Sequence, residues 1–107
     1  MTWKHTQEWL EQCSTMVHYA ATEANPDGLV SAAKWYINRF EQLGFSVQTI
    51  ENKDASYRPL IVAVRAPKNG CETHVGFFHH YDVEPVQKTW DYDPWTLTER
   101  AQRAYGR

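Results

Sequence analysis

The chain has 107 residues, 42% hydrophobic and 22% charged, which fits a single globular domain. Its formal charge of −2 offers no basic surface for nucleic acid, and no apolar run approaches the ~20 residues of a membrane span. Cys13 and Cys71 lack metal-site spacing, and the polar amino terminus is unlike a secretory signal. We therefore expect free thiols, a cytoplasmic location, and no nucleic-acid or membrane partner.

Two amphipathic helices come first. Apolar residues recur every three or four positions over residues 2–21, and a second such stripe runs over residues 30–43. Pro26 separates the helices, because it disfavours helical geometry in the residue before it. We expect Asp27 to cap the second helix. Gly44 is expected to follow the end of that helix in the left-handed conformation.

Strands are predicted next. Residues 45–51 alternate as a strand with one wet face, whereas residues 60–64 and 75–78 are continuously apolar, as in strands covered on both faces. Their links are too short for crossover helices, so neighbouring strands that pair should be antiparallel. A loop follows, with a short strand possible over residues 96–100 and frayed residues at the end. The predicted fold class is α/β, in the order α-α-β-β-β and then loop.

His80 and Asp82 stand where the third predicted strand ends. Side chains just outside the carboxyl ends of strands form the active sites of many α/β enzymes. An imidazole can bind a metal through one ring nitrogen while a nearby carboxylate holds the other N–H. The pair alone is a weak signal, because an Asp at a strand end also serves as a cap or turn residue.

The residues that follow make the pattern specific. Behind the His-x-Asp pair come further elements in a fixed order: Val83-x-Pro85, Trp90, Asp93-Pro94-Trp95, Thr98-Glu99 and Tyr105-Gly106-Arg107. This series resembles the first signature of the dizinc amidohydrolases of peptidase clan MH. That group includes carnosine-type dipeptidases, glutamate carboxypeptidases, and deacylases of acetylornithine and succinyl-diaminopimelate. His79 departs from the pattern, which usually has Gly there; we expect a packed or hydrogen-bonded structural histidine. Trp95 replaces the usual Phe and keeps an aromatic wall.

The resemblance implies an enzyme with two zinc ions, or cobalt or manganese in their place. His80 would be a metal ligand and Asp82 the carboxylate that orients its ring, whereas the substrate-binding residues stay unassigned. The substrate would be a small peptide or an N-acyl amino acid. The bridging Asp, the general-base Glu and the other ligands lie beyond Arg107 in the family. We therefore expect residues 1–107 to be the opening portion of a three-layer α/β/α catalytic domain with a mixed sheet.

Three functions stay open. A metallopeptidase of dipeptidase or carboxypeptidase type is preferred, inactive as the isolated chain, since one His ligand does not hold a catalytic zinc. The alternatives are a fragment of a small-molecule N-deacylase and a non-catalytic module that folds and associates. The apolar strands over residues 60–64 and 75–78 also predict self-association, because an open strand edge is a template for another chain.

Overall fold

The structure is a computed structural model that describes residues 6–107 as two helices and two antiparallel hairpins. The elements are α1 (Thr6–His18), α2 (Pro26–Gln42), β1 (Ser46–Ile50), β2 (Leu60–Val64), β3 (Thr98–Arg100) and β4 (Arg103–Tyr105). The predicted α/β class is confirmed. Residues 2–5 of the first predicted helix lie outside the described residues, and that helix ends at His18 rather than Ala21. Neither helix is long and apolar enough to cross a membrane.

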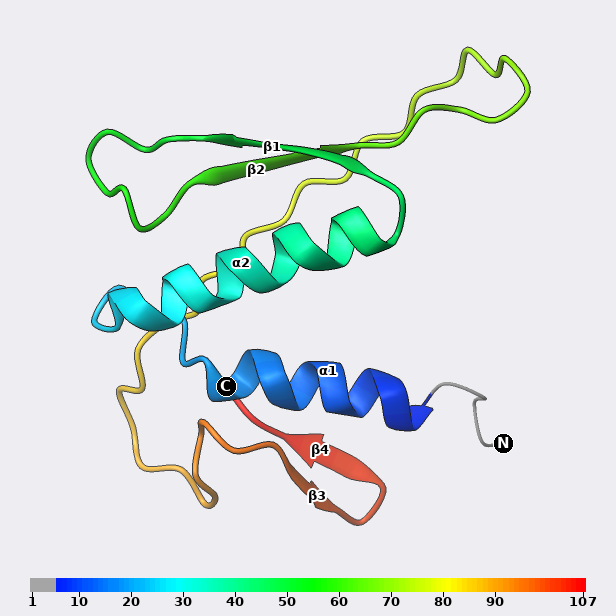
Figure 1. Cartoon of the computed structure of the whole chain (residues 1–107). Coiled ribbons are helices and arrows are strands. Elements are labelled where there is room, and N and C mark those ends of the chain that lie inside the picture. The colour runs from blue at the N-terminus through cyan, green and yellow to red at the C-terminus, as the bar shows by residue number, and fades with distance from the viewer. Residues whose placement is uncertain (1–5) are drawn as a thin grey trace.

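The elements are arranged around α2. In Figure 1, α2 lies between the β1–β2 hairpin and α1, and the β3–β4 hairpin lies on the other side of α1. Gly106, just after β4, comes so close to α1 that a Cβ there would be 3.0 Å from both methyl groups of Val17. The radius of gyration is 16.4 Å, against about 13 Å for a compact domain of this size. The molecule is therefore an open assembly of elements with a small core.

The corner between the helices is organised by Asn25. Its Oδ1 accepts a hydrogen bond from the Gly28 amide at 3.3 Å, which caps α2. Its Nδ2 donates to the carbonyl oxygens of Tyr19 at 3.2 Å and Ala20 at 3.1 Å, just beyond α1. The prediction that Asp27 caps α2 was wrong. Pro26 is favoured at the first helical position, where no amide is needed, so the cap falls on the residue before it.

The other end of α2 confirms the predicted role of Gly44. This residue has a φ of 82°, and its amide donates to the Glu41 carbonyl at 2.9 Å. The Phe45 amide donates to the Phe40 carbonyl at 3.0 Å, and the two phenylalanine rings lie 5.4 Å apart. These bonds and the ring contact form a Schellman motif, which turns the chain from α2 into β1.

The core is small and centred on the start of α2. Ala21, Leu29 and Ala32 form its buried cluster, and Leu29 is its largest fully buried side chain. Four half-buried side chains pack against this cluster: Met16, Tyr19, Tyr57 and Tyr81. Leu43, at the end of the predicted stripe, is 45% exposed. Burial on α2 is therefore concentrated in its first half.

The third predicted strand does not form. Val75, Phe77 and Phe78 are 74%, 86% and 90% exposed, and residues 71–88 contain no strand. An extended segment needs a neighbour for its backbone hydrogen bonds to become a strand. Within residues 6–107, β2 pairs with β1 and takes no second partner.

The chain end also differs from the expectation of frayed residues. The short strand expected over residues 96–100 is present as β3, and it pairs with β4 in a hairpin that the sequence reading missed. The Arg107 amide donates to the Pro94 carbonyl at 2.8 Å. The end of the chain is therefore tied to the loop that precedes β3.

Replacing Gly28 with Ala should destabilise the fold. A Cβ at this position would collide with the Tyr19 carbonyl oxygen and lie 2.5 Å from Asn25 Nδ2, so the helix corner would have to open. Overpacking of this kind costs about 1–3 kcal/mol. Urea unfolding followed by circular dichroism measures the loss. The matched control is Gly76→Ala, where nothing lies within 4 Å; equal stability of the two variants would contradict the close packing at Gly28.

Candidate functional site

Tyr81 fixes the segment that carries the His-x-Asp pair. Its hydroxyl donates to the Pro59 carbonyl at 2.9 Å, and its ring centroid lies 6.2 Å from that of Tyr36 on α2. Burial is the main reason that the pKa of the Tyr81 phenol is raised. Two residues on, the Val83 amide donates to the Ala21 carbonyl at 2.8 Å, in the corner between the helices. These contacts attach the segment to the core.

The flanking residues lie on the solvent side of this anchor. His80 and Asp82 have side chains that are 82% and 45% exposed, respectively. Successive residues of an extended chain point to opposite sides, so an inward Tyr81 turns its two neighbours outward. Sequence reasoning found the outward pair but missed Tyr81, which had no local signal because its partner Pro59 is distant in sequence.

The contact between His80 and Asp82 determines which ring nitrogen of His80 carries the proton. His80 Nδ1 lies 2.8 Å from the Asp82 carbonyl oxygen and 3.2 Å from its carboxylate Oδ1. Both oxygens are acceptors, so Nδ1 carries the proton. In a neutral ring, Nε2 is then left with a lone pair that faces outward. This donor set suits a metal ion that is soft enough for imidazole, such as zinc or cobalt.

The described residues do not assemble a complete metal-binding group. Nowhere in residues 6–107 do three or more His, Cys, Asp or Glu side chains gather in a group that could hold a metal ion. His80 and Asp82 therefore stand as a pair, without a third such side chain beside them in this part of the chain.

Two further residues, His79 and Asp93, can be compared with what the sequence predicts. His79 is exposed, so the expectation that it packs as a structural histidine was wrong; with the third strand absent, no layer covers it. Asp93 is a turn residue. Its Oδ1 accepts from the Trp95 amide at 3.0 Å and its Oδ2 from the Thr96 hydroxyl at 2.8 Å. These two hydrogen bonds, the Trp95 one first, lower the pKa of the Asp93 carboxyl.

Arg107 holds the loop that follows Asp82, and sequence reasoning had no signal for this contact. Its Nε donates to the Glu84 carbonyl at 3.0 Å. A shallow hollow of about 270 Å³ lies beside this bond. Its lining consists of six consecutive or nearby loop residues and the arginine: Glu84, Pro85, Val86, Gln87, Lys88, Trp90 and Arg107.

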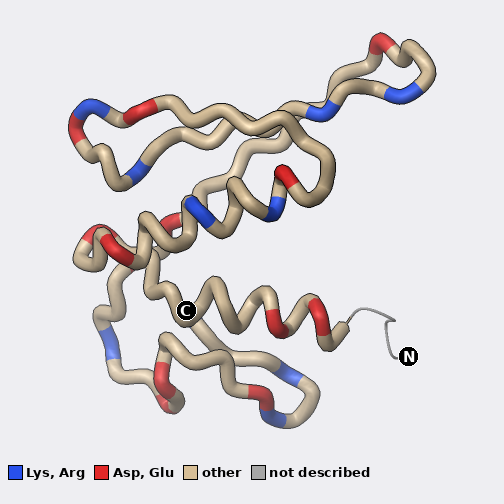
Figure 2. Tube along the Cα trace, viewed as in Figure 1, with Lys and Arg blue, Asp and Glu red and all other residues tan. Residues whose placement is uncertain are grey.

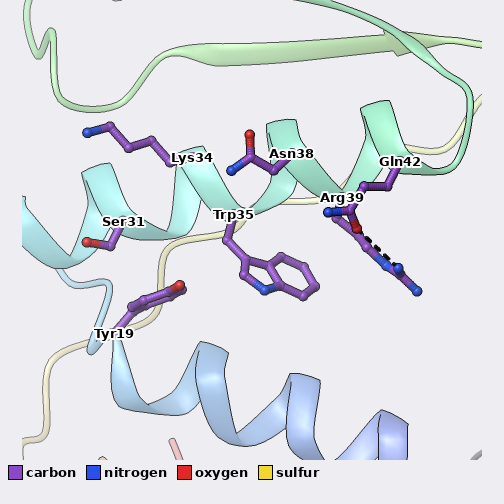
Figure 3. A pocket seen from close by; sticks show the side chains of 7 residues that line it. All are labelled: Tyr19, Ser31, Lys34, Trp35, Asn38, Arg39 and Gln42. Carbon is purple, nitrogen blue, oxygen red and sulfur yellow. Dashed lines mark hydrogen bonds between the residues drawn. The ribbon is translucent and has the colours of Figure 1, made fainter.

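A larger hollow, about 360 Å³, lies along α2 and away from the His-x-Asp pair. Figure 3 shows that its side chains diverge: Lys34 points toward the hairpin side, whereas Trp35 and Arg39 point toward α1. The Arg39 guanidinium already contacts Gln42 at 3.5 Å and Glu8 at 3.8 Å. The polar groups that line this hollow therefore do not converge on a single ligand.

Comparison with known proteins adds one relative. Over 105 residues the chain is 31% identical to a cysteinylglycine-S-conjugate dipeptidase of Corynebacterium striatum. The matched part covers 91% of this chain and 22% of that protein, so the chain spans about a fifth of its relative's length. No family model matches. The chain is thus similar to part of a dipeptidase.

Removing the Tyr81 hydroxyl should loosen the anchor. Tyr81→Phe deletes the hydrogen bond to Pro59 and leaves a half-buried carbonyl unpaired, at a cost of about 1 kcal/mol. Urea unfolding tests this, and amide exchange at Val83 should become faster. Tyr92→Phe is the control, since it keeps the ring contact between Tyr92 and Tyr105. An unchanged midpoint for Tyr81→Phe would show that the hydroxyl does not hold the segment.

The Asp93 turn should be sensitive to acid. Because the folded-state pKa of Asp93 is lowered from 3.8, its contribution to stability is present above that pH and is lost as the pH falls through the folded value. Carboxyl carbon NMR shifts should titrate with a midpoint below 3.8. Thr96→Val removes one of the two hydrogen bonds and should raise the midpoint, whereas Thr98→Val should not. A midpoint at or above 3.8 would refute the hydrogen-bonded turn.

Proposed function

We propose that the chain is the opening portion of a zinc-dependent dipeptidase of peptidase clan MH, within a three-layer α/β/α catalytic domain. The observation that carries the proposal is the His80–Asp82 contact, which leaves Nε2 free and outward at the end of an anchored segment. The 31% identity to part of a named dipeptidase supports it independently. The two free cysteines fit the reducing cytoplasm, where we expect the enzyme to act.

His80 is proposed as a ligand of one of two metal ions, bound through Nε2. Asp82 is proposed to keep the proton on Nδ1 and to fix the ring, which raises the basicity of the ligand. A pair of bound metals supplies a nucleophilic water of lowered pKa and polarises the scissile carbonyl. The relative's name makes an S-conjugate of cysteinylglycine the first substrate to test.

Metal binding tests His80 directly on this chain. In a zinc titration followed by ¹⁵N NMR, the Nε2 signal of His80 should shift, whereas that of its exposed neighbour His79 should not. Binding should be weak, because catalytic zinc normally has three protein ligands. Asp82→Ala should weaken it about 10–100-fold. A shift of His79 without His80 would show that the wrong histidine has been chosen.

Measuring peptide hydrolysis tests the proposed roles of His80 and Asp82 within a whole enzyme. A chimera should carry this chain in place of the matching segment of the Corynebacterium striatum dipeptidase, and hydrolysis of a cysteinylglycine S-conjugate is measured with zinc, cobalt or manganese. His80→Ala should abolish turnover, and Asp82→Ala should lower it about 10–100-fold. His79→Ala is the matched control and should stay near the unmodified chimera. Full activity of His80→Ala would refute the assignment.

A further inference from the structure

The loop that follows β2 turns in solvent at an Asn-Gly pair. Residues 65–75, which we call the Asn69 loop, are all exposed, and in Figure 1 they project beyond the end of the β1–β2 hairpin. The chain reverses at Asn69 and Gly70, whose φ values are 61° and 67°. Glycine adopts positive φ without strain and asparagine tolerates it, so this pair forms the turn. An amide side chain and the main-chain amide of a glycine therefore stand next to each other in water.

The two groups are not restrained by other residues. Within residues 6–107, neither the Asn69 side chain nor the Gly70 amide takes part in a hydrogen bond or an ion pair. A Cβ placed on Gly70 would have no atom within 4 Å. Glycine also has the widest range of backbone conformations of any residue. The Gly70 nitrogen can therefore approach the side-chain carbonyl carbon of Asn69.

We propose that Asn69 is a site of spontaneous deamidation through a cyclic succinimide. The Gly70 nitrogen gives up its proton and forms a bond to Asn69 Cγ, while the C–N bond of the side-chain amide breaks. The leaving nitrogen takes up a proton and departs as ammonia. Water then opens the ring at either of its two carbonyl carbons, which yields aspartate or isoaspartate. The net reaction consumes water and releases ammonia, so no oxidant or reductant takes part.

The three other asparagines of the chain are not followed by glycine, and each is protected. Asn25 precedes Pro26, whose nitrogen has no proton to lose, and its side chain is hydrogen-bonded in the helix corner. Asn38 lies inside α2, where the next main-chain amide donates within the helix. Asn52 Oδ1 accepts a hydrogen bond of 3.1 Å from the amide two residues further on. We therefore expect the reaction to select one asparagine of the four.

Deamidation would change the charge of the Asn69 loop and, in isoaspartate, the length of its main chain. Arg65, Lys68 and Glu72 give this loop an excess of one positive charge, which one new carboxylate cancels. Figure 2 shows the charges as blue and red bands along the loop. The contacts of Tyr81 and Val83 that anchor the His-x-Asp segment lie outside the loop, so we expect them to survive. The proposal is therefore independent of metal binding and catalysis.

Incubation of the 107-residue chain in ¹⁸O-labelled water at mildly alkaline pH tests the proposal. Peptide mass spectrometry should find ¹⁸O at Asn69, in both aspartate and isoaspartate, while the three other asparagines of the same sample remain amides. Gly70→Ala should slow the reaction about tenfold, because a Cβ restricts the rotation that ring closure needs. Gly76→Ala is the matched control, since nothing lies within 4 Å there either, and should leave the rate unchanged. Circular dichroism confirms that each variant is folded.

A synthetic peptide with the sequence of residues 65–75 shows whether the fold protects the site. The folded chain should react as fast as this peptide, because the structure does not restrain the turn. A folded chain that reacts at least tenfold more slowly than the peptide would overturn the proposal. Equal rates for Gly70→Ala and Gly76→Ala, or ¹⁸O in aspartate without isoaspartate, would overturn it as well. The zinc titration of His80 does not depend on Asn69, so the two proposals fail separately.

Discussion

The side chain of Asn25 is the contact on which the arrangement depends. One amide group caps α2 through its oxygen and closes the end of α1 through its nitrogen, so both helices share a single polar group. Gly28 allows this because its missing side chain lets the Tyr19 carbonyl approach α2. The Ala21 carbonyl, in the same corner, receives the amide of Val83. The corner thus sets the angle of the helices and the position of the His-x-Asp segment together.

The fold buries few large apolar side chains. The buried cluster contains two alanines and one leucine, whereas the large apolar side chains of Val75, Phe77 and Phe78 are exposed to water. The hydrophobic free energy of a buried aromatic side chain is about 1.5–3 kcal/mol relative to an exposed one. Leaving Phe77 and Phe78 exposed therefore forgoes a large stabilisation. The same shortage of covering layers explains why His79 is exposed.

Features set by local physics were predictable from the sequence. The helical stripes, the Gly44 turn and the antiparallel pairing of β1 with β2 depend on neighbours along the chain, and all are present. The cap at Asn25 could also have been predicted, because Pro26 marks the first helical position. The prediction chose the acidic Asp27 instead.

Features that depend on distant partners were not predictable. Residues 75–78 have the composition of a buried strand, yet composition does not supply the neighbour that a strand requires. The bond from Arg107 to Glu84 joins segments with no shared pattern. Tyr81 belongs to the same class, because its role is fixed by Pro59 and Tyr36. At the site itself, the family resemblance singled out His80 and Asp82, but only the fold revealed what holds them. The β4 strand was missed for another reason: it pairs with β3 across a two-residue turn at Ala101 and Gln102, which lacks the Gly, Asn or Asp that usually marks such a turn.

The contacts of Tyr81 that anchor the His-x-Asp segment also affect the proposed binding of metal by His80. A ligand that is oriented before the metal arrives loses less conformational freedom on binding. His80 gains this preorganisation from two sources: Asp82 holds Nδ1, and the neighbouring Tyr81 ties the backbone to the core. Neither contact uses Nε2. The proton position and ring direction can therefore be fixed by the chain alone, while the strength of metal binding depends on the ligands that join His80. That division predicts that His80 is already in the Nδ1–H form without metal, which the ¹⁵N shifts of its two ring nitrogens measure. Asp82→Ala should leave this form in place, because the main-chain carbonyl oxygen of residue 82 still accepts from Nδ1.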